Sequence, residues 1–223
     1  MTAAPDAHDR LGAALRCLAD VAVRTGADED ELAIAAARVE AVTAHLAAQP
    51  ANHRVHDSPY HPMSIVGGTA HPWAPQLHTA PDGVGVAGVV TLGPSHEGGP
   101  GLAHGGVLSL LFDHAMGQAV YVSGQSAMTV SLEVRYRAPT PLGIPLGVSA
   151  RVDRTQGRRV FVTAEVRADG RLTAEASGVF LTLTAENVAQ IFPADRIPAE
   201  TSIPPEPDSP DGQGVFEGLV TGS

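Results

Sequence analysis

The chain has 223 residues, 43% hydrophobic and 17% charged, with a formal net charge of −10. This composition predicts a globular protein built around one sizeable domain with additional segments. The negative charge argues against nucleic acid and acidic membranes as partners. No run approaches the roughly 18–20 apolar residues of a membrane span, and the N-terminus lacks a secretory pattern. We therefore expect a soluble, cytoplasmic protein without membrane insertion.

All 14 basic residues are arginines, and the chain holds a single cysteine, Cys17. The lack of lysine excludes Schiff-base catalysis, a P-loop lysine and serine–lysine hydrolases. One cysteine excludes an intrachain disulfide and a Cys-x-x-Cys site. Because Cys17 lies in a helical pattern, we interpret it as a small buried hydrophobic residue and not as a nucleophile.

The first 50 residues predict a pair of helices. Apolar residues recur at helical spacing from Leu11 to Ala22 and again from Leu32 to Leu46. Between them, Asp28 followed three residues later by Glu31 is typical of a helix N-terminus. We expect this pair to pack on the main body or on a partner chain.

Residues 51–83 are rich in proline, which predicts loops, and they hold five histidines: His53, His56, His61, His71 and His78. No two of them have the regular spacing of a ligand pair on a helix or hairpin. We interpret them as ordinary loop histidines and expect neither a metal site nor a cofactor.

The central segment predicts an antiparallel sheet around a helix. Residues 84–92 resemble a strand, whereas residues 107–122 are apolar on nearly all sides, as in a buried helix. Short turns join the later segments, which favours hairpins and a sheet that curls around the helix. Four strand-like segments follow the helix: 128–136, 146–152, 160–166 and 172–183.

The segment from His104 to Asp113 holds the most informative motif. Gly105 and Gly106 open the helix, where unpaired backbone N–H groups favour developing negative charge. Asp113 lies in an otherwise apolar helix, where a carboxylate is costly unless it is paired. An oxyanion donor and a carboxylate base suffice for attack by water on an activated carbonyl. A structural Asp113 that caps a neighbouring loop is the alternative, and His114 points about 100° away.

Three segments resemble hot-dog-fold acyl-CoA thioesterases of the phenylacetate-pathway and human thioesterase-superfamily kind. They are residues 101–117, 128–141 and 157–161, within a match over roughly residues 62–184. The resemblance implies an α+β hot-dog fold, a curled antiparallel sheet wrapped around one long buried helix and preceded by the helical pair. It implies hydrolysis of an acyl-CoA thioester to a free acid and CoA.

With this resemblance, the chain divides into four parts. They are a helical pair (1–50), a proline- and histidine-rich loop region (51–83), a hot-dog domain (84–186) and an extended tail (187–223). The tail is rich in proline, glycine and acidic residues.

The resemblance also implies roles for matched residues. The Gly105 N–H would polarise the thioester carbonyl, His104 would shape its loop and Gly106 would contact the substrate. Asp113 would act as general base or nucleophile. Thr129, on the polar side of its strand, would position water or substrate. Some relatives have asparagine or glutamine at position 98, where this chain has glycine.

Two other functions are compatible with the same fold. A non-catalytic protein could bind or sense acyl-CoA, in which case the ligand would stabilise the protein without turnover. A hot-dog hydratase or dehydratase would use His104 for proton transfer, and absorbance of the enoyl thioester would reveal it.

Arginines are concentrated between residues 131 and 171, a segment with eight arginines and four acidic residues. Guanidinium groups bind phosphates in a bidentate manner, so we predict that some hold the nucleotide end of CoA. The alternative is a set of solvent-facing strand residues. The candidates are Arg135, Arg137, Arg158 and Arg159.

Helix geometry predicts a shared site. Gly105 and Asp113 are eight residues apart, which is about 12 Å along a helix. Both groups must lie within about 3–4 Å of one reacting carbonyl. One helix cannot achieve this, but two antiparallel helices related by a two-fold axis can. We therefore expect a homodimer, or a dimer of dimers, with each site shared between two subunits.

Overall fold

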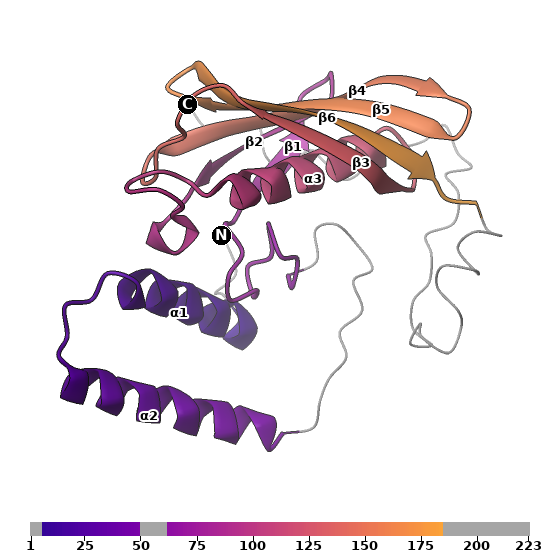
Figure 1. Ribbon diagram of the computed structural model, residues 1–223. Coiled ribbons are helices and arrows are strands. Elements are labelled where there is room, and N and C mark those ends of the chain that lie inside the picture. The colour runs from indigo at the N-terminus through magenta and orange to yellow at the C-terminus, as the bar shows by residue number, and fades with distance from the viewer. Residues whose placement is uncertain (1–5, 50–61, 185–223) are drawn as a thin grey trace, which may run out of the picture.

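The computed structural model describes residues 6–49 and 62–184. A six-stranded antiparallel sheet with the order β1-β2-β4-β5-β6-β3 lies across the central helix α3, Gly105–Val122 (Figure 1). The predicted α+β architecture of one long helix against a curled sheet is confirmed. The strands are β1 His78–Pro81, β2 Val86–Thr91, β3 Ala127–Tyr136, β4 Pro145–Gln156, β5 Arg159–Ala168 and β6 Arg171–Thr182.

The core lies between α3 and the inner face of the sheet. Half of the 18 residues of α3 are buried, which explains why its sequence is apolar on nearly all sides. Gly178 of β6 lets the helix approach closely, because a Cβ there would lie 2.8 Å from the sulfur of Met116. Burial of apolar side chains between this helix and the sheet stabilises the domain.

Two details differ from the sequence prediction. The strand β1 lies inside the segment that we expected to be loop, and its four residues include Pro81, which hides it from pattern analysis. Cys17 is exposed, because it lies on the outer side of its helix and not toward the domain.

Strand β3 forms an edge of the sheet and contains a β-bulge. Thr129 pairs with Phe180 of β6, and Ser131 pairs with the next residue, Val179, so that Val130 is the extra residue. A bulge shifts the alternation of side chains by one. Thr129 therefore lies on the same face as the buried Phe180, whereas simple alternation had placed it on the polar face.

The two N-terminal helices, α1 Ala7–Ala22 and α2 Glu29–Ala47, differ in how they pack. Helix α1 lies on the segment before β1. The Arg16 guanidinium donates to the carbonyl oxygens of Thr69 and His71 at 2.8 and 2.7 Å, and Gly12 packs against Ala70. No residue of α2 is buried. The expected packing on the main body is thus confirmed for α1 alone.

One buried chain of polar groups lies beneath the sheet. The Gln118 amide donates to His114 Nε2, 2.8 Å away, and the Thr79 hydroxyl donates to the Gln118 carbonyl oxygen. Burial lowers the pKa of His114 to about 4, against the opposing influence of Asp113. The imidazole is therefore neutral and accepts a hydrogen bond near neutral pH.

The lowered pKa of His114 predicts that the folded protein is less stable in acid. The unfolded state binds a proton near pH 6.5, but the folded state binds it only near pH 4. The free energy of unfolding should therefore fall between pH 6.5 and 4, by up to about 3 kcal/mol, with no contribution from His114 to a change above pH 6.5. Urea titrations across this range measure the effect. His114→Gln, which remains neutral, should have a flatter profile, and an unchanged profile would contradict this assignment.

The candidate active site

The N-terminus of α3 is shaped by His104. Its Nδ1 accepts a hydrogen bond from the Gly106 N–H at 3.0 Å, so His104 caps the helix. Its backbone N–H donates to the carbonyl oxygen of His96 at 2.9 Å. These contacts fix the loop that enters the helix, and they occupy the Nδ1 lone pair that proton transfer by this nitrogen would need.

Gly105, the first residue of α3, offers the expected donor. No hydrogen bond among the described residues uses its N–H. Its carbonyl oxygen, in contrast, accepts from the hydroxyls of Tyr136 at 2.9 Å and Ser109 at 3.1 Å. The N–H therefore remains available to an incoming oxyanion, and the peptide on the other side of Gly105 is held in place.

Tyr136 is a site residue that sequence reasoning did not identify. A Cβ on Gly105 would lie 3.0 Å from its hydroxyl oxygen, so glycine lets the phenol approach the helix backbone. In the sequence, Tyr136 is one of several large apolar positions on a strand, 31 residues beyond Gly105. Only the packing of β3 along α3 brings the two together.

Asp113 lies at the other end of this contact between α3 and β3. Its Oδ1 accepts a hydrogen bond from the Thr129 hydroxyl at 2.7 Å. The side chain of Asp113 is half-buried and Thr129 is exposed. A partner thus offsets the cost of placing a carboxylate in an apolar helix, and the bulge at Val130 supplies it.

The candidate phosphate-binding arginines form two separate groups. Arg135 pairs with Glu133 at 2.7 Å, and Arg137 pairs with Glu175, both near the end of β3 beside Gly105. Arg158 donates to the carbonyl oxygen of Thr182 at 3.0 Å. Arg159 of β5 pairs with Leu181 of β6, and Leu181 pairs with Met128 of β3. Arg158 and Arg159 therefore lie near the first residues of β3, at the end of the strand where Thr129 contacts Asp113.

Comparison with known proteins identifies the family. The thioesterase superfamily matches residues 100–175. The crystal structure of RHA08564, a thioesterase superfamily protein, is 31% identical with a TM-score of 0.73, and the match covers 81% of this chain and 94% of that chain. The chain belongs to the thioesterase superfamily.

Two curated thioesterases are similar over the central region. Acyl-coenzyme A thioesterase THEM4 of Xenopus laevis is 38% identical over 94 residues, which are 41% of this chain and 42% of its own. Acyl-coenzyme A thioesterase THEM5 of Mus musculus is 32% identical over 100 residues, or 44% and 40%. The chain thus matches about two fifths of the length of these relatives.

Glycine at position 98 has a steric explanation in this member of the thioesterase superfamily. A Cβ at this position would lie 2.7 Å from the Cα of His104. The backbone before the helix therefore approaches too closely for the asparagine or glutamine that we expected in some relatives. A polar side chain that contacts the substrate must therefore lie at a position other than 98.

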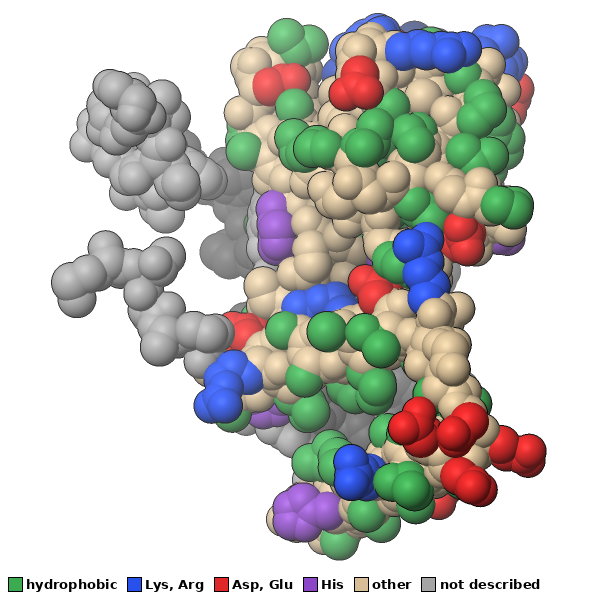
Figure 2. All heavy atoms as spheres, turned by 90° about the vertical axis from the view of Figure 1, so that its left-hand side faces the viewer, with side chains coloured by type: hydrophobic (Ala, Val, Ile, Leu, Met, Phe, Trp, Pro, Cys, Tyr) green, Lys and Arg blue, Asp and Glu red, His purple; other side chains and the backbone are tan. Residues whose placement is uncertain are grey.

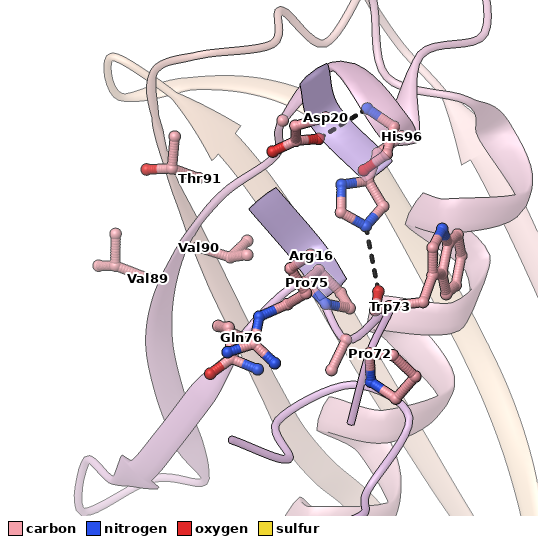
Figure 3. A pocket seen from close by; sticks show the side chains of 13 residues that line it. Arg16, Asp20, Pro72, Trp73, Pro75, Gln76, Val89, Val90, Thr91 and His96 are labelled. Carbon is pink, nitrogen blue, oxygen red and sulfur yellow. Dashed lines mark hydrogen bonds between the residues drawn. The ribbon is translucent and has the colours of Figure 1, made fainter. Parts of the chain in front are cut away.

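A pocket of about 350 Å³ lies apart from Gly105 and Asp113, between α1, β2 and the 3₁₀ helix η1, Pro94–His96 (Figure 3). Asp20 accepts from the Ser95 N–H at 2.9 Å, and the buried His96 ring packs beside Trp73. Arg24, two residues after the end of α1, lies 3.8 Å from Glu97, which accepts a hydrogen bond from the Gly101 N–H. These contacts join α1 and the residues that follow it to the glycine-rich loop before α3.

No group of metal ligands occurs among residues 6–49 and 62–184. His53, His56 and His61 lie outside these ranges. No helix within the described ranges is long and apolar enough to cross a membrane.

Proposed function

We propose that this protein hydrolyses an acyl-CoA thioester to a carboxylic acid and CoA. The arrangement of Asp113 carries the proposal: a partly exposed carboxylate accepts a hydrogen bond from the Thr129 hydroxyl. It lies on the helix that begins with the Gly105 N–H, to which no described residue is hydrogen-bonded. Membership of the thioesterase superfamily and the names of the curated relatives support it. Because acyl-CoA is an intracellular metabolite, we propose a cytoplasmic location.

The residues of the chain account for each step of the hydrolysis. Asp113 takes a proton from water as the water oxygen bonds to the thioester carbonyl carbon. The partner subunit's Gly105 N–H and the dipole of the helix that it begins stabilise the resulting oxyanion. When the carbonyl re-forms, the C–S bond breaks and CoA leaves as a thiolate, which takes the proton held by Asp113 and so regenerates the carboxylate. Direct attack by Asp113, through an anhydride that water then opens, uses the same groups.

The exposed edge of β3 supports the shared site in a homodimer. A long unpaired edge strand is usually covered, and Met128 and Val130 on β3 are 40% and 59% exposed. Asp113 lies beside Thr129 and Gly105 beside Tyr136, near opposite ends of this strand. Antiparallel pairing of two β3 strands about their centres would therefore bring the partner's Gly105 toward Asp113, with two equivalent sites per dimer.

The same pairing would unite the two arginine groups. Arg158 and Arg159 of one subunit would lie at the same end of the interface as Arg135 and Arg137 of the partner subunit. We propose that this combined cluster binds the phosphates of CoA, since four guanidinium groups exceed the nearby Glu133 and Glu175 in charge.

This cluster predicts a binding defect. Arg159→Ala should raise KM for acyl-CoA several-fold, with kcat nearly unchanged, because a phosphate contact contributes to binding of both substrate and transition state. The effect should shrink with added salt. Arg171→Ala, at the start of β6, is the matched control for loss of one exposed arginine. A KM unaffected in single variants at all four positions would contradict the cluster.

The activity itself is tested by thiol release from a panel of short, long and aromatic acyl-CoA esters. We expect turnover of at least one ester. Binding of CoA esters without thiol release would exclude hydrolysis and favour a sensing role, whereas a change in enoyl absorbance without thiol release would favour a hydratase.

A further inference from the structure

Helix α2 presents an apolar seam that nothing in the described chain covers. Its residues Leu32, Val39, Val42 and Leu46 are 47%, 41%, 52% and 47% exposed. With Ala35 they follow a strict spacing of three and four residues, the a and d positions of a coiled-coil heptad. We call these five residues the α2 seam.

The physical chemistry of α2 requires a partner for this seam. An isolated helix of 19 residues is marginal in water, and helices in proteins gain stability mainly by packing an apolar face. Helix α1 does not supply this packing, because its own Leu18 and Val21 are 42% and 58% exposed. Figure 2 shows hydrophobic side chains open to solvent on both helices.

We propose that the α2 seam binds the α2 seam of a second copy of this chain, in antiparallel orientation. The seam is suited to a two-fold interface because Val39 lies at its centre and Leu32 and Leu46 lie seven residues to either side. In an isologous contact each residue meets a residue of the same patch on the other copy. Leu32 of each copy therefore lies near Leu46 of the other, and Val39 lies near the two-fold axis.

The charges beside the seam select the antiparallel orientation. The first turn of α2 is acidic, with Glu29, Asp30 and Glu31, and its last turn holds His45. Glu31, Arg38 and His45 occupy equivalent flanking positions, directly before Leu32, Val39 and Leu46. Antiparallel pairing places Glu31 beside the partner's His45 and the two Arg38 side chains near the axis. It keeps the two acidic first turns apart and opposes the helix dipoles. Parallel pairing would stack the two acidic turns against each other.

This interface is independent of the one proposed at the β3 edge. It uses neither Asp113 nor Gly105, and α2 makes no hydrogen bond to α3 or β3 among the described residues. A chain with both interfaces assembles as a dimer of dimers, and loss of the α2 interface leaves the β3 interface intact.

Cysteine cross-linking tests the proposal directly. Cys17, the native cysteine, is first replaced by serine, and Val39→Cys is then introduced at the expected axis. Ala37→Cys is the matched control, since Ala37 is also exposed and lies about 200° away around the helix. Under mild oxidation we expect most Val39→Cys chains to form a disulfide-linked pair and few Ala37→Cys chains to do so.

Light scattering provides a second measurement. Val39→Glu should halve the mass of the assembly while thiol release per chain is retained, and circular dichroism should show the sheet domain folded. Equal masses for the variant and the native chain would overturn the proposal, as would equal cross-linking at positions 37 and 39. If a Val39→Cys chain that ends at residue 184 cross-links but the full-length Val39→Cys chain does not, residues 185–223 cover the seam. That outcome would exclude a second copy as its partner in the full-length protein.

Discussion

Replacing Asp113 with asparagine should lower kcat for acyl-CoA hydrolysis by about 10²–10⁴-fold, the usual contribution of a positioned general base. The amide cannot accept a proton from water, but its oxygen can still accept the hydrogen bond that Thr129 donates at 2.7 Å. The loss should therefore appear with little change in fold stability. Steady-state kinetics together with thermal melting separates the two quantities.

A second aspartate–threonine pair provides the matched control. Asp153 accepts a hydrogen bond from the Thr163 hydroxyl at 2.9 Å, on strands β4 and β5 away from the candidate site. Asp153→Asn makes the same chemical change and should leave kcat within about twofold, since surface changes away from a site have small effects. Comparable kcat values for the two variants would show that Asp113 has a structural role only.

Replacing Gly105 with proline should lower kcat by about 10²–10³-fold, because it removes the N–H donor of the proposed oxyanion site. Proline is well tolerated at the first position of a helix, and His104 before it already has an extended backbone with ψ of 135°. Gly105→Ala is the control: it adds the same Cβ beside Tyr136 and keeps the N–H. The alanine variant should retain more activity than the proline variant.

Mixing these defects tests whether each site is shared. Asp113→Ala chains and Gly105→Pro chains should each be nearly inactive, but a mixed dimer keeps one site with a native Gly105 and a native Asp113. After random subunit exchange the mixture should recover up to about a quarter of native activity, since half of the dimers are mixed and each has one intact site. Exchange is verified by mass spectrometry. No recovery, or full activity in a monomer, would exclude the shared site.

The architecture could be predicted because side-chain periodicity reports burial. The run from Val107 to Val122 is apolar on nearly all sides, and it forms most of the buried helix α3. The β4, β5 and β6 segments alternate strongly because one face of each covers that helix. Strand β1 could not be predicted, since four residues that end in proline carry no usable period.

The candidate site was predicted less completely, because part of it depends on contacts between distant segments. The glycines and Asp113 share one helix, and their spacing could be read directly. The contact of Tyr136 with Gly105 depends on how β3 crosses α3, which no local pattern encodes. The orientation of Thr129 depends on a bulge without a marker such as glycine. The roles of these residues in catalysis remain predictions.

The extra residue Val130 sets a limit on how this strand can change. Thr129 lies opposite Phe180 only because Val130 is left out of the ladder. A strand of the same length without the bulge would pair Val130 with Phe180, and the hydroxyl of Thr129 would then point to the outer face of the sheet. Asp113 would lose its hydrogen-bond donor without any substitution in the helix that carries it. A homologous chain could thus keep the histidine, both glycines and the aspartate, and still lack an anchored base because its edge strand has no bulge.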